Sequence, residues 1–126
     1  MRDTRQVIDT YYQTSGRDWD AWLTLFDSNV VLEDQLEGQV EGIEAVRGVV
    51  DRFRRGYSRF QMTPLHITIE DDHACVVWHC RAANATGVPI DARGANYFHI
   101  VDGKIVRMAD FHDTVPFEPY DSQDLS

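Results

Sequence analysis

The chain has 126 residues, of which 43% are hydrophobic and 26% charged, and its formal net charge is −9. These values are ordinary for one globular domain, which we expect to cover residues 1–126 and to end in a loose acidic tail over residues 115–126. The excess of acidic residues argues against nucleic acid as a partner, because phosphate contacts need concentrated Lys and Arg.

The ends and the apolar runs of the chain give no sign of a membrane or of secretion. The first residues, Met-Arg-Asp-Thr-Arg-Gln, are polar, and no apolar run reaches the length of a membrane span. Cys75 and Cys80 are five positions apart in a strand-like segment, so they belong to opposite faces. We expect two buried thiols rather than a disulfide, and a cytoplasmic location.

Hydrophobic spacing predicts helices ahead of a series of strands. Residues 3–16 begin with a capping box and carry apolar residues at helical spacing. Residues 18–26 predict a second, short helix, and residues 42–55 a third with an apolar stripe. After Gly56 the period changes to the alternation of strands. The predicted strands are residues 30–36, 65–70, 74–83, 88–101 and 104–112, with a hairpin signal at Asp102-Gly103.

This order predicts the α+β class, with helices grouped ahead of an antiparallel sheet. A curved sheet around three helices would enclose a conical hollow. The strand over residues 30–36 places Asp34 on the same face as Val30 and Leu32, because residues two apart share a face. A carboxylate in an apolar row either finds a partner, takes up a proton or faces a cavity. Alternatively, Asp34 begins the turn toward Gly38.

Other kinds of site are not indicated by spacing. The five His residues show no ligand pair at helical or hairpin spacing, and there is no C-x-x-C motif, so we expect no metal. No glycine-rich phosphate loop or nucleotide fingerprint is present either. We therefore expect no cofactor, and any chemistry has to run on side chains alone.

Three segments resemble the nuclear transport factor 2-like superfamily, in particular its ketosteroid isomerase and SnoaL-like branches. They are Trp22-Leu23-Thr24-Leu25-Phe26, Gly42-Ile43-Glu44-Ala45-Val46-Arg47 and Asp102-Gly103-Lys104-Ile105. The resemblance covers residues 4–113. It implies a cone-shaped fold in which three N-terminal helices pack on a curved, mainly antiparallel sheet, but it does not specify a reaction, because this fold carries several chemistries and also proteins without any.

The resemblance to the steroid isomerases assigns catalytic roles. Asp34 falls at the position of their general base, and Tyr11, with Tyr12 as a close rival, at that of the oxyanion-hole tyrosine. Asn96 falls where they hold a protonated Asp, which is also how that enzyme serves as a general example of pKa tuning. An amide donates a weaker hydrogen bond than a neutral carboxylic acid, so this departure puts steroid isomerisation itself in doubt.

The resemblance to SnoaL-like polyketide cyclases gives another assignment. Their acid/base Asp lies on the final strand, where Asp110 stands in this chain, and alternation places His112 on the same face. The remaining residues of the expected hollow are apolar and would contact the substrate: Leu32, Trp22, Phe98, Met108 and Phe53.

Three functions follow from these assignments. The first is a cofactor-independent acid/base enzyme for a small hydrophobic carbonyl compound, steroid- or polyketide-like, which isomerises it by α-proton abstraction. The second is a cyclase or dehydratase that uses Asp110 and His112. The third is a non-catalytic module that binds a hydrophobic ligand or dimerises. A homodimer through the sheet is expected in each case, with Tyr97 or Trp78 at the interface, depending on which face turns outward.

Overall fold

A computed structural model describes residues 1–125 of the chain. The elements are α1 (Thr4–Thr14), α2 (Trp19–Leu23), β1 (Phe26–Asp34), β2 (Gly38–Glu41), α3 (Ile43–Gly56), β3 (Tyr57–Glu70), β4 (His73–Asn84), β5 (Pro89–Val101), β6 (Lys104–His112), the 3-10 helix η1 (Val115–Phe117) and α4 (Glu118–Asp121). Within the described residues, no helix is long and apolar enough to cross a membrane.

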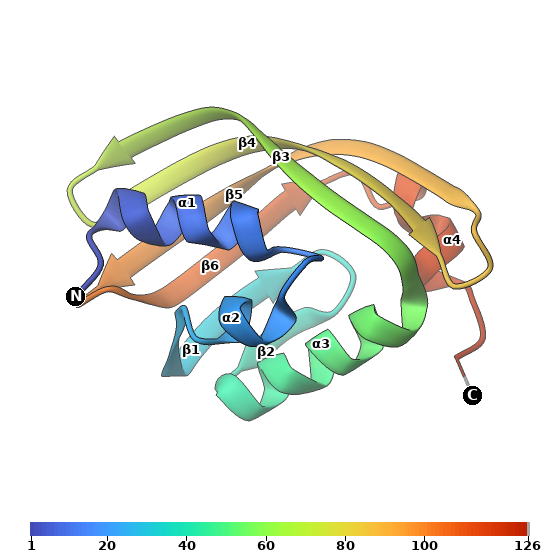
Figure 1. Cartoon of the computed structure of the whole chain (residues 1–126), viewed down its shortest axis with the longest axis horizontal. Helices are drawn as coiled ribbons and strands as arrows, with labels where there is room; N and C mark the ends of the chain where they lie inside the picture. Colours follow the sequence, from blue (N-terminus) through green and yellow to red (C-terminus); the bar gives the residue numbers. More distant parts are fainter. Residues whose placement is uncertain (126) are drawn as a thin grey trace.

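The six strands form one curved, open sheet in the order β2-β1-β6-β5-β4-β3. All neighbouring strands are antiparallel except β1 and β6, which run parallel and bring Leu32 opposite Met108. In Figure 1 the long strands arch over α1, α2 and α3, and α4 lies at the other end of the sheet from the N-terminus. The core fills the space between the helices and the concave face of the sheet.

Local sequence explains where the helices begin and which side they bury. The Asp3 side chain accepts a hydrogen bond from the backbone N–H of Gln6, and the Gln6 side chain returns one to Asp3, so the predicted capping box is present. One face of α1 is buried through Val7, Ile8 and two neighbouring tyrosines. This face lies toward the sheet and places an aromatic hydroxyl group in the interior.

The α+β class agrees with the sequence, but the described residues contain a fourth α-helix, α4, and the strands extend further than expected. A short strand, β2, follows Asp34 and pairs antiparallel with β1, so these two strands form a hairpin. Strand β3 begins at Tyr57, well before the expected start at Leu65. Pro64 made that segment unlike a strand, and the sheet accommodates it because β3 lies at an edge and its pairing shifts between Pro64 and His66.

The segment expected to be a loose tail contains η1 and α4 and is anchored to the body. Phe117 and Tyr120 are buried, and the Tyr120 ring stacks on Tyr57 with ring centroids 4.3 Å apart. A pattern of two aromatics among prolines and acids is too short for periodicity to reveal this docking.

The two cysteines are both free and lie on opposite faces of β4, but only Cys80 is buried. The expectation that Cys75 is buried was wrong, because it lies on the outward face of β4.

Gly94 on β5 leaves room for the side chain of Trp78, its partner on the neighbouring strand β4. A Cβ atom at this position would lie 2.5 Å from Cζ2 of Trp78 and 2.7 Å from the backbone oxygen of Phe111. We expect Gly94→Ala to lower the free energy of unfolding by about 1–3 kcal/mol through overpacking, measured by chemical denaturation. Gly48→Ala is the matched control: it meets no atom within 4 Å in the middle of α3 and should stabilise by about 1 kcal/mol. Equal effects of the two substitutions would contradict the close packing.

Candidate active site

A cavity lies between the concave face of the sheet and the helices. The space that the centre of a water-sized sphere can reach inside it is about 70 Å³, so the cavity has room for only a few small groups. Helices, strands and the C-terminal segment all contribute to its wall. The residues that line it are Tyr11, Ser15, Trp19, Trp22, Leu32, Asp34, Leu36, Val49, Phe53, Tyr57, Phe60, Met62, Trp78, Cys80, Met108, Asp110, His112 and Phe117. The wall is thus mainly aromatic and aliphatic, with few groups that can move a proton.

Asp34 lies at the end of β1 and has two roles in the structure. It lines the cavity, as the alternation of β1 predicted, and it also begins the turn that follows. Its Oδ1 atom accepts hydrogen bonds from the backbone N–H groups of Leu36 and Glu37, both at 2.8 Å. These two donors compensate negative charge on the carboxylate without an ionic partner. Both expectations for this residue, the inward-facing carboxylate and the start of a turn, therefore apply.

The arginine near Asp34, Arg52, pairs with Glu37 instead of with Asp34. Arg52 on α3 donates to Oε2 of Glu37 at 2.6 Å, and the hydroxyl of Tyr120 donates to Oε1 of the same residue. The ion pairs found among residues 1–125 do not include Asp34. Because none of these ion pairs occupies the Asp34 carboxylate, it is available to accept a proton.

Asp110 on β6 lies beside Asp34. The parallel register pairs Glu33 with Ala109, so the next residue of each strand turns into the cavity on neighbouring strands. Burial raises the pKa of Asp110 well above its usual value, and the charge of Asp34 and a hydrogen bond between the two carboxyl groups raise this pKa further. Burial and the neighbouring charge therefore favour the protonated form of Asp110, which can donate a hydrogen bond to Asp34.

Tyr11 supplies a hydroxyl group to the same region. It lines the cavity from α1, and the pKa of Tyr11 is raised well above its usual value by burial and then by the negative charges of Asp110 and Asp34. The phenol consequently stays protonated and is a hydrogen-bond donor. Its ring packs against Phe98 and Trp22, with centroids 5.0 and 5.6 Å away, which fixes its position.

Asn96 does not belong to the wall of the cavity, which corrects the site predicted from the sequence. Its side chain is buried, and its amide N–H donates a hydrogen bond to the Tyr12 hydroxyl at 2.9 Å, whereas its Oδ1 atom has no partner among residues 1–125. Asn96 faces Asp110 across the β5–β6 pair, but Asp110 reaches the cavity and Asn96 does not. The rival tyrosine, Tyr12, is the one that contacts Asn96, whereas Tyr11 faces the carboxyl groups.

His112 shares the inner face of β6 with Asp110, as predicted, and lines the cavity. Its Nδ1 atom lies 2.8 Å from the backbone oxygen of Asp113. Because a carbonyl oxygen only accepts, Nδ1 carries the proton, and Nε2 of the neutral ring is an acceptor. The ring packs against Trp78 and Phe117, with centroids 5.8 and 4.7 Å away.

Four of the five predicted substrate contacts line the cavity: Leu32, Trp22, Met108 and Phe53. Phe98 does not, because Tyr11 covers its ring, and it is fully buried in the core. The sequence missed Trp78, which alternation placed on one face of its strand without deciding that this face is the inner one. It also missed Phe117, in the segment expected to be loose.

Two buried donors of wall residues, the indole N–H groups of Trp22 and Trp78, have no hydrogen-bond partner among residues 1–125. An unsatisfied buried donor costs about 1–3 kcal/mol, so an oxygen of a bound molecule or a water would stabilise this wall.

The Cys80 thiol nearby is not a nucleophile, because burial and the charge of Asp91 raise its pKa to about 12.

Within the cavity no set of His, Cys, Asp and Glu atoms is arranged to hold a metal, as far as the described residues go. The three-residue group that is arranged in this way, Asp72, His73 and His99, lies on the outward face of the sheet.

Comparisons with known proteins agree on the fold. A family model described as "SnoaL-like domain" matches residues 7–108. An NTF2-like protein of unknown function from Burkholderia pseudomallei has a TM-score of 0.85 at 15% identity, over 98% of this chain and 100% of that one. A proposed SnoaL-like polyketide cyclase from Jannaschia sp. has a TM-score of 0.80 at 18% identity, over 96% and 92% of the two chains.

A third structure contains a small molecule. It is a hypothetical protein from Catenulispora acidiphila with a ketosteroid isomerase-like fold in complex with trimethylamine, and its TM-score is 0.82 at 15% identity, over 97% of this chain and 96% of that one. No curated protein matches the chain. At these identities the solved structures show the fold alone.

The neutral Asp110 makes stability depend on pH. Its pKa is raised in the folded state, so the folded chain keeps a proton that the unfolded chain loses above about pH 4, and the stability from this group falls as pH rises. We expect Asp110→Asn to gain stability relative to wild type between pH 4 and 7, by up to about 1.4 kcal/mol per pH unit, in urea denaturation at each pH.

Asp91→Asn is the control for this prediction. The hydrogen bond from His79 lowers the pKa of Asp91, so the shift has the opposite sign and no gain should appear as pH rises. Parallel pH profiles of wild type and Asp110→Asn would contradict the neutral state of Asp110.

Proposed function

This chain belongs to the SnoaL-like domain family, and from this premise we propose that it is a cofactor-independent acid–base enzyme for a small apolar carbonyl compound. The fold resembles those of NTF2-like and ketosteroid isomerase-like proteins, as inferred from the sequence, but a fold hosts many reactions. The proposal therefore depends on the chemistry of the cavity.

One observation carries the proposal: a neutral carboxylic acid and a second carboxyl group share an apolar cavity. The protonated form of Asp110 is favoured by burial beside Asp34, and Asp34 accepts hydrogen bonds from two backbone N–H groups instead of pairing with a cation. Pairs of titratable groups whose environments differ in this way divide into an acid and a base. We assign Asp34 as the base and Asp110 as the acid.

The reaction begins when a carbonyl oxygen of the substrate replaces Asp34 as the acceptor of the Asp110 proton. Asp34 then removes a proton from the carbon α to that carbonyl, and the negative charge moves to the oxygen. The Asp110 and Tyr11 hydroxyl groups donate hydrogen bonds to this enolate oxygen. If Asp34 returns the proton to a different carbon, the product is an isomer and the enzyme is unchanged.

The wall indicates the substrate class. Trp22, Phe53 and Met108 provide apolar contacts, and the unpaired N–H of Trp78 suits a second oxygen of the substrate. The volume of about 70 Å³ favours a compact molecule over a steroid, which would fit only if side chains of the wall moved. A small cyclic or aryl ketone, or a β-dicarbonyl compound, meets these conditions.

His112 supports a second candidate, cyclisation with loss of water. Its Nε2 is an acceptor within the same wall, so it is a further base for an α proton. The carbanion would attack a second carbonyl of the same molecule, and Asp110 would give its proton to the new alkoxide. Elimination of that hydroxyl as water requires His112 first to return its proton to Asp110. His112 then removes a second α proton while Asp110 protonates the leaving hydroxide, and a second return of the proton from His112 to Asp110 restores both groups.

Exchange of α protons in D2O, followed by NMR, tests the step that both candidates share. The panel contains small cyclic enones, aryl ketones and β-diketones. We expect wild type to accelerate exchange of at least one compound, and Asp34→Asn to slow it by about 10²–10⁴-fold. Tyr11→Phe removes one donor to the enolate and should slow it by about 10²–10³-fold.

Glu33→Gln is the matched control, because this carboxylate is adjacent in sequence but faces outward and pairs with Arg107. It should leave exchange unchanged. His112→Gln separates the candidates: loss of exchange in this variant, with exchange retained in Asp34→Asn, favours cyclisation. Absence of exchange across the panel, with ligands bound equally by wild type and Asp34→Asn, would favour the non-catalytic binding module.

We also propose a homodimer through the outward face of the sheet. Val77, Ala95 and Phe111 form a row across three strands, and the Phe111 side chain is 56% exposed. Trp78, one of the two aromatics expected there, faces the cavity instead. Phe111→Glu should shift the mass in light scattering from dimer to monomer, while Val115→Glu, an exposed position outside the strands, should not. A monomeric wild-type protein would overturn this proposal.

A further inference from the structure

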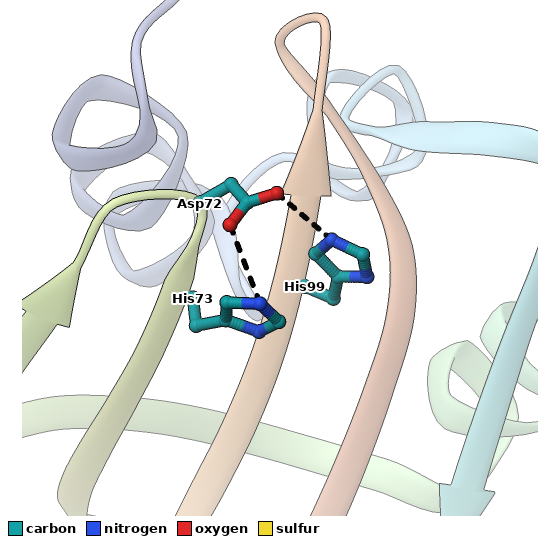
Figure 2. A group of neighbouring side chains, drawn as sticks. All are labelled: Asp72, His73 and His99. Atoms are coloured by element: carbon teal, nitrogen blue, oxygen red, sulfur yellow. Dashed lines mark hydrogen bonds and ion pairs between the residues drawn. The ribbon is translucent and has the colours of Figure 1, made fainter.

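Three potential metal ligands meet on the outward face of the sheet, at the turn between β3 and β4. Asp72 lies in the turn, His73 is the first residue of β4, and His99 is near the end of β5. Figure 2 shows the two imidazole rings side by side with the carboxylate of Asp72 directed at both. Nitrogen and oxygen atoms from the three side chains lie within 4.8 Å of one another.

The backbone explains why these residues meet. His73 and His99 are directly opposite in the antiparallel β4–β5 pair, so their side chains emerge from the same face at the same level. The turn is fixed as well, because the backbone N–H of Ile100 donates to the backbone oxygen of Asp72 at 2.8 Å. The cluster is therefore held by the sheet and does not depend on a mobile loop.

His73 and His99 present the same ring nitrogen, Nε2, to Asp72. Nε2 of His99 lies 3.0 Å from one carboxylate oxygen, and Nε2 of His73 lies 3.3 Å from the other. The rings are stacked with centroids 4.4 Å apart and an interplanar angle of 13°. Both Nε2 atoms thus converge on the carboxylate.

A hydrogen bond on the far side of one ring favours the form that binds metal. Nδ1 of His73 lies 2.6 Å from the hydroxyl oxygen of Tyr97. When Nδ1 donates its proton to this oxygen, the lone pair of the neutral ring is on Nε2, which faces Asp72. Such a partner on the second ring nitrogen is a general feature of histidine ligands and orients the ring.

We propose that Asp72, His73 and His99 bind a divalent transition-metal ion, with Zn²⁺ as the expected occupant. Two imidazoles and one carboxylate suit ions of borderline softness, and three protein ligands leave a position for water or another molecule. The side chains are accessible from solvent, with 48%, 50% and 32% exposure for His73, Asp72 and His99. On entry, the ion replaces the proton that Nε2 of His99 shares with Asp72 and binds the lone pair on Nε2 of His73.

This site is independent of the cavity. Ala74 and Phe98, the strand neighbours of the two histidines, are buried on the opposite face, so the metal lies on the other side of the sheet from Asp34 and Asp110. The spacing of the histidines in the sequence had indicated no metal, because the ligands come together only through strand pairing. The inference does not rest on the proposed reaction.

Titration of the chelator-treated, tag-free chain with Zn²⁺ in a calorimeter tests the proposal. We expect one ion per chain, with affinity lowered at least about 10-fold in His99→Gln and in Asp72→Asn, and lowered about 10–100-fold in Tyr97→Phe. Titration with Co²⁺ gives a second readout, since absorption in the visible region reports its coordination. Circular dichroism of each variant establishes that the fold is retained.

His79→Gln is the matched control. His79 pairs with Asp91 on the same face, Nε2 to Oδ1 at 2.7 Å, and the described residues contain no second imidazole in that pair. Zn²⁺ affinity should be unchanged in this variant. The proposal is overturned if wild type shows no saturable binding, if His79→Gln weakens binding as much as His99→Gln does, or if a chain with both His73→Gln and His99→Gln binds as tightly as wild type.

Discussion

A neutral carboxylic acid held beside a carboxylate is the interaction on which the proposed chemistry depends. It requires an apolar wall, which makes ionisation of Asp110 costly, and a neighbouring Asp34 whose carboxyl group has hydrogen-bond donors other than a cation. The turn after β1 meets the second requirement, since two backbone N–H groups bind the Asp34 carboxylate. The pairing of Arg52 with Glu37 contributes as well, because it occupies the nearest cation.

The parallel pairing of β1 with β6 brings these two groups together. Residues 76 positions apart in the chain become neighbours because the last strand is inserted between β1 and β5. The last strand, β6, also presents His112 to the cavity, which lies between the sheet and the helices α1, α2 and α3. A site of this kind has a cost in stability, since the buried carboxyl of Asp110 and the unpaired N–H of Trp78 are both unfavourable without a ligand.

The two faces of the sheet serve different purposes. Strand alternation directs Met108 and Asp110 inward, and Arg107 and Phe111 outward. The inner face is covered by α1, α2 and α3 (Figure 1). Among residues 1–125 no helix covers the outer face, and its cross-strand pairs gather polar side chains at one end, where His73 and His99 meet. Chemistry on one side is therefore compatible with metal binding or assembly on the other.

The sequence by itself determined the α+β class, the capped first helix, the hairpin at Asp102-Gly103 and the inward direction of Asp34, because these follow from periods and caps within short segments. It also indicated the family through those segments. Tertiary structure alone decided that Asp110, and not Asn96, is the acidic partner of Asp34, that Tyr11 and not Tyr12 faces them, and that the tail is anchored by Phe117 and Tyr120. The same holds for the cluster at Asp72. In each case the deciding factor is strand register or the packing of distant segments, and no local pattern encodes either, because both depend on which parts of the chain become neighbours after folding.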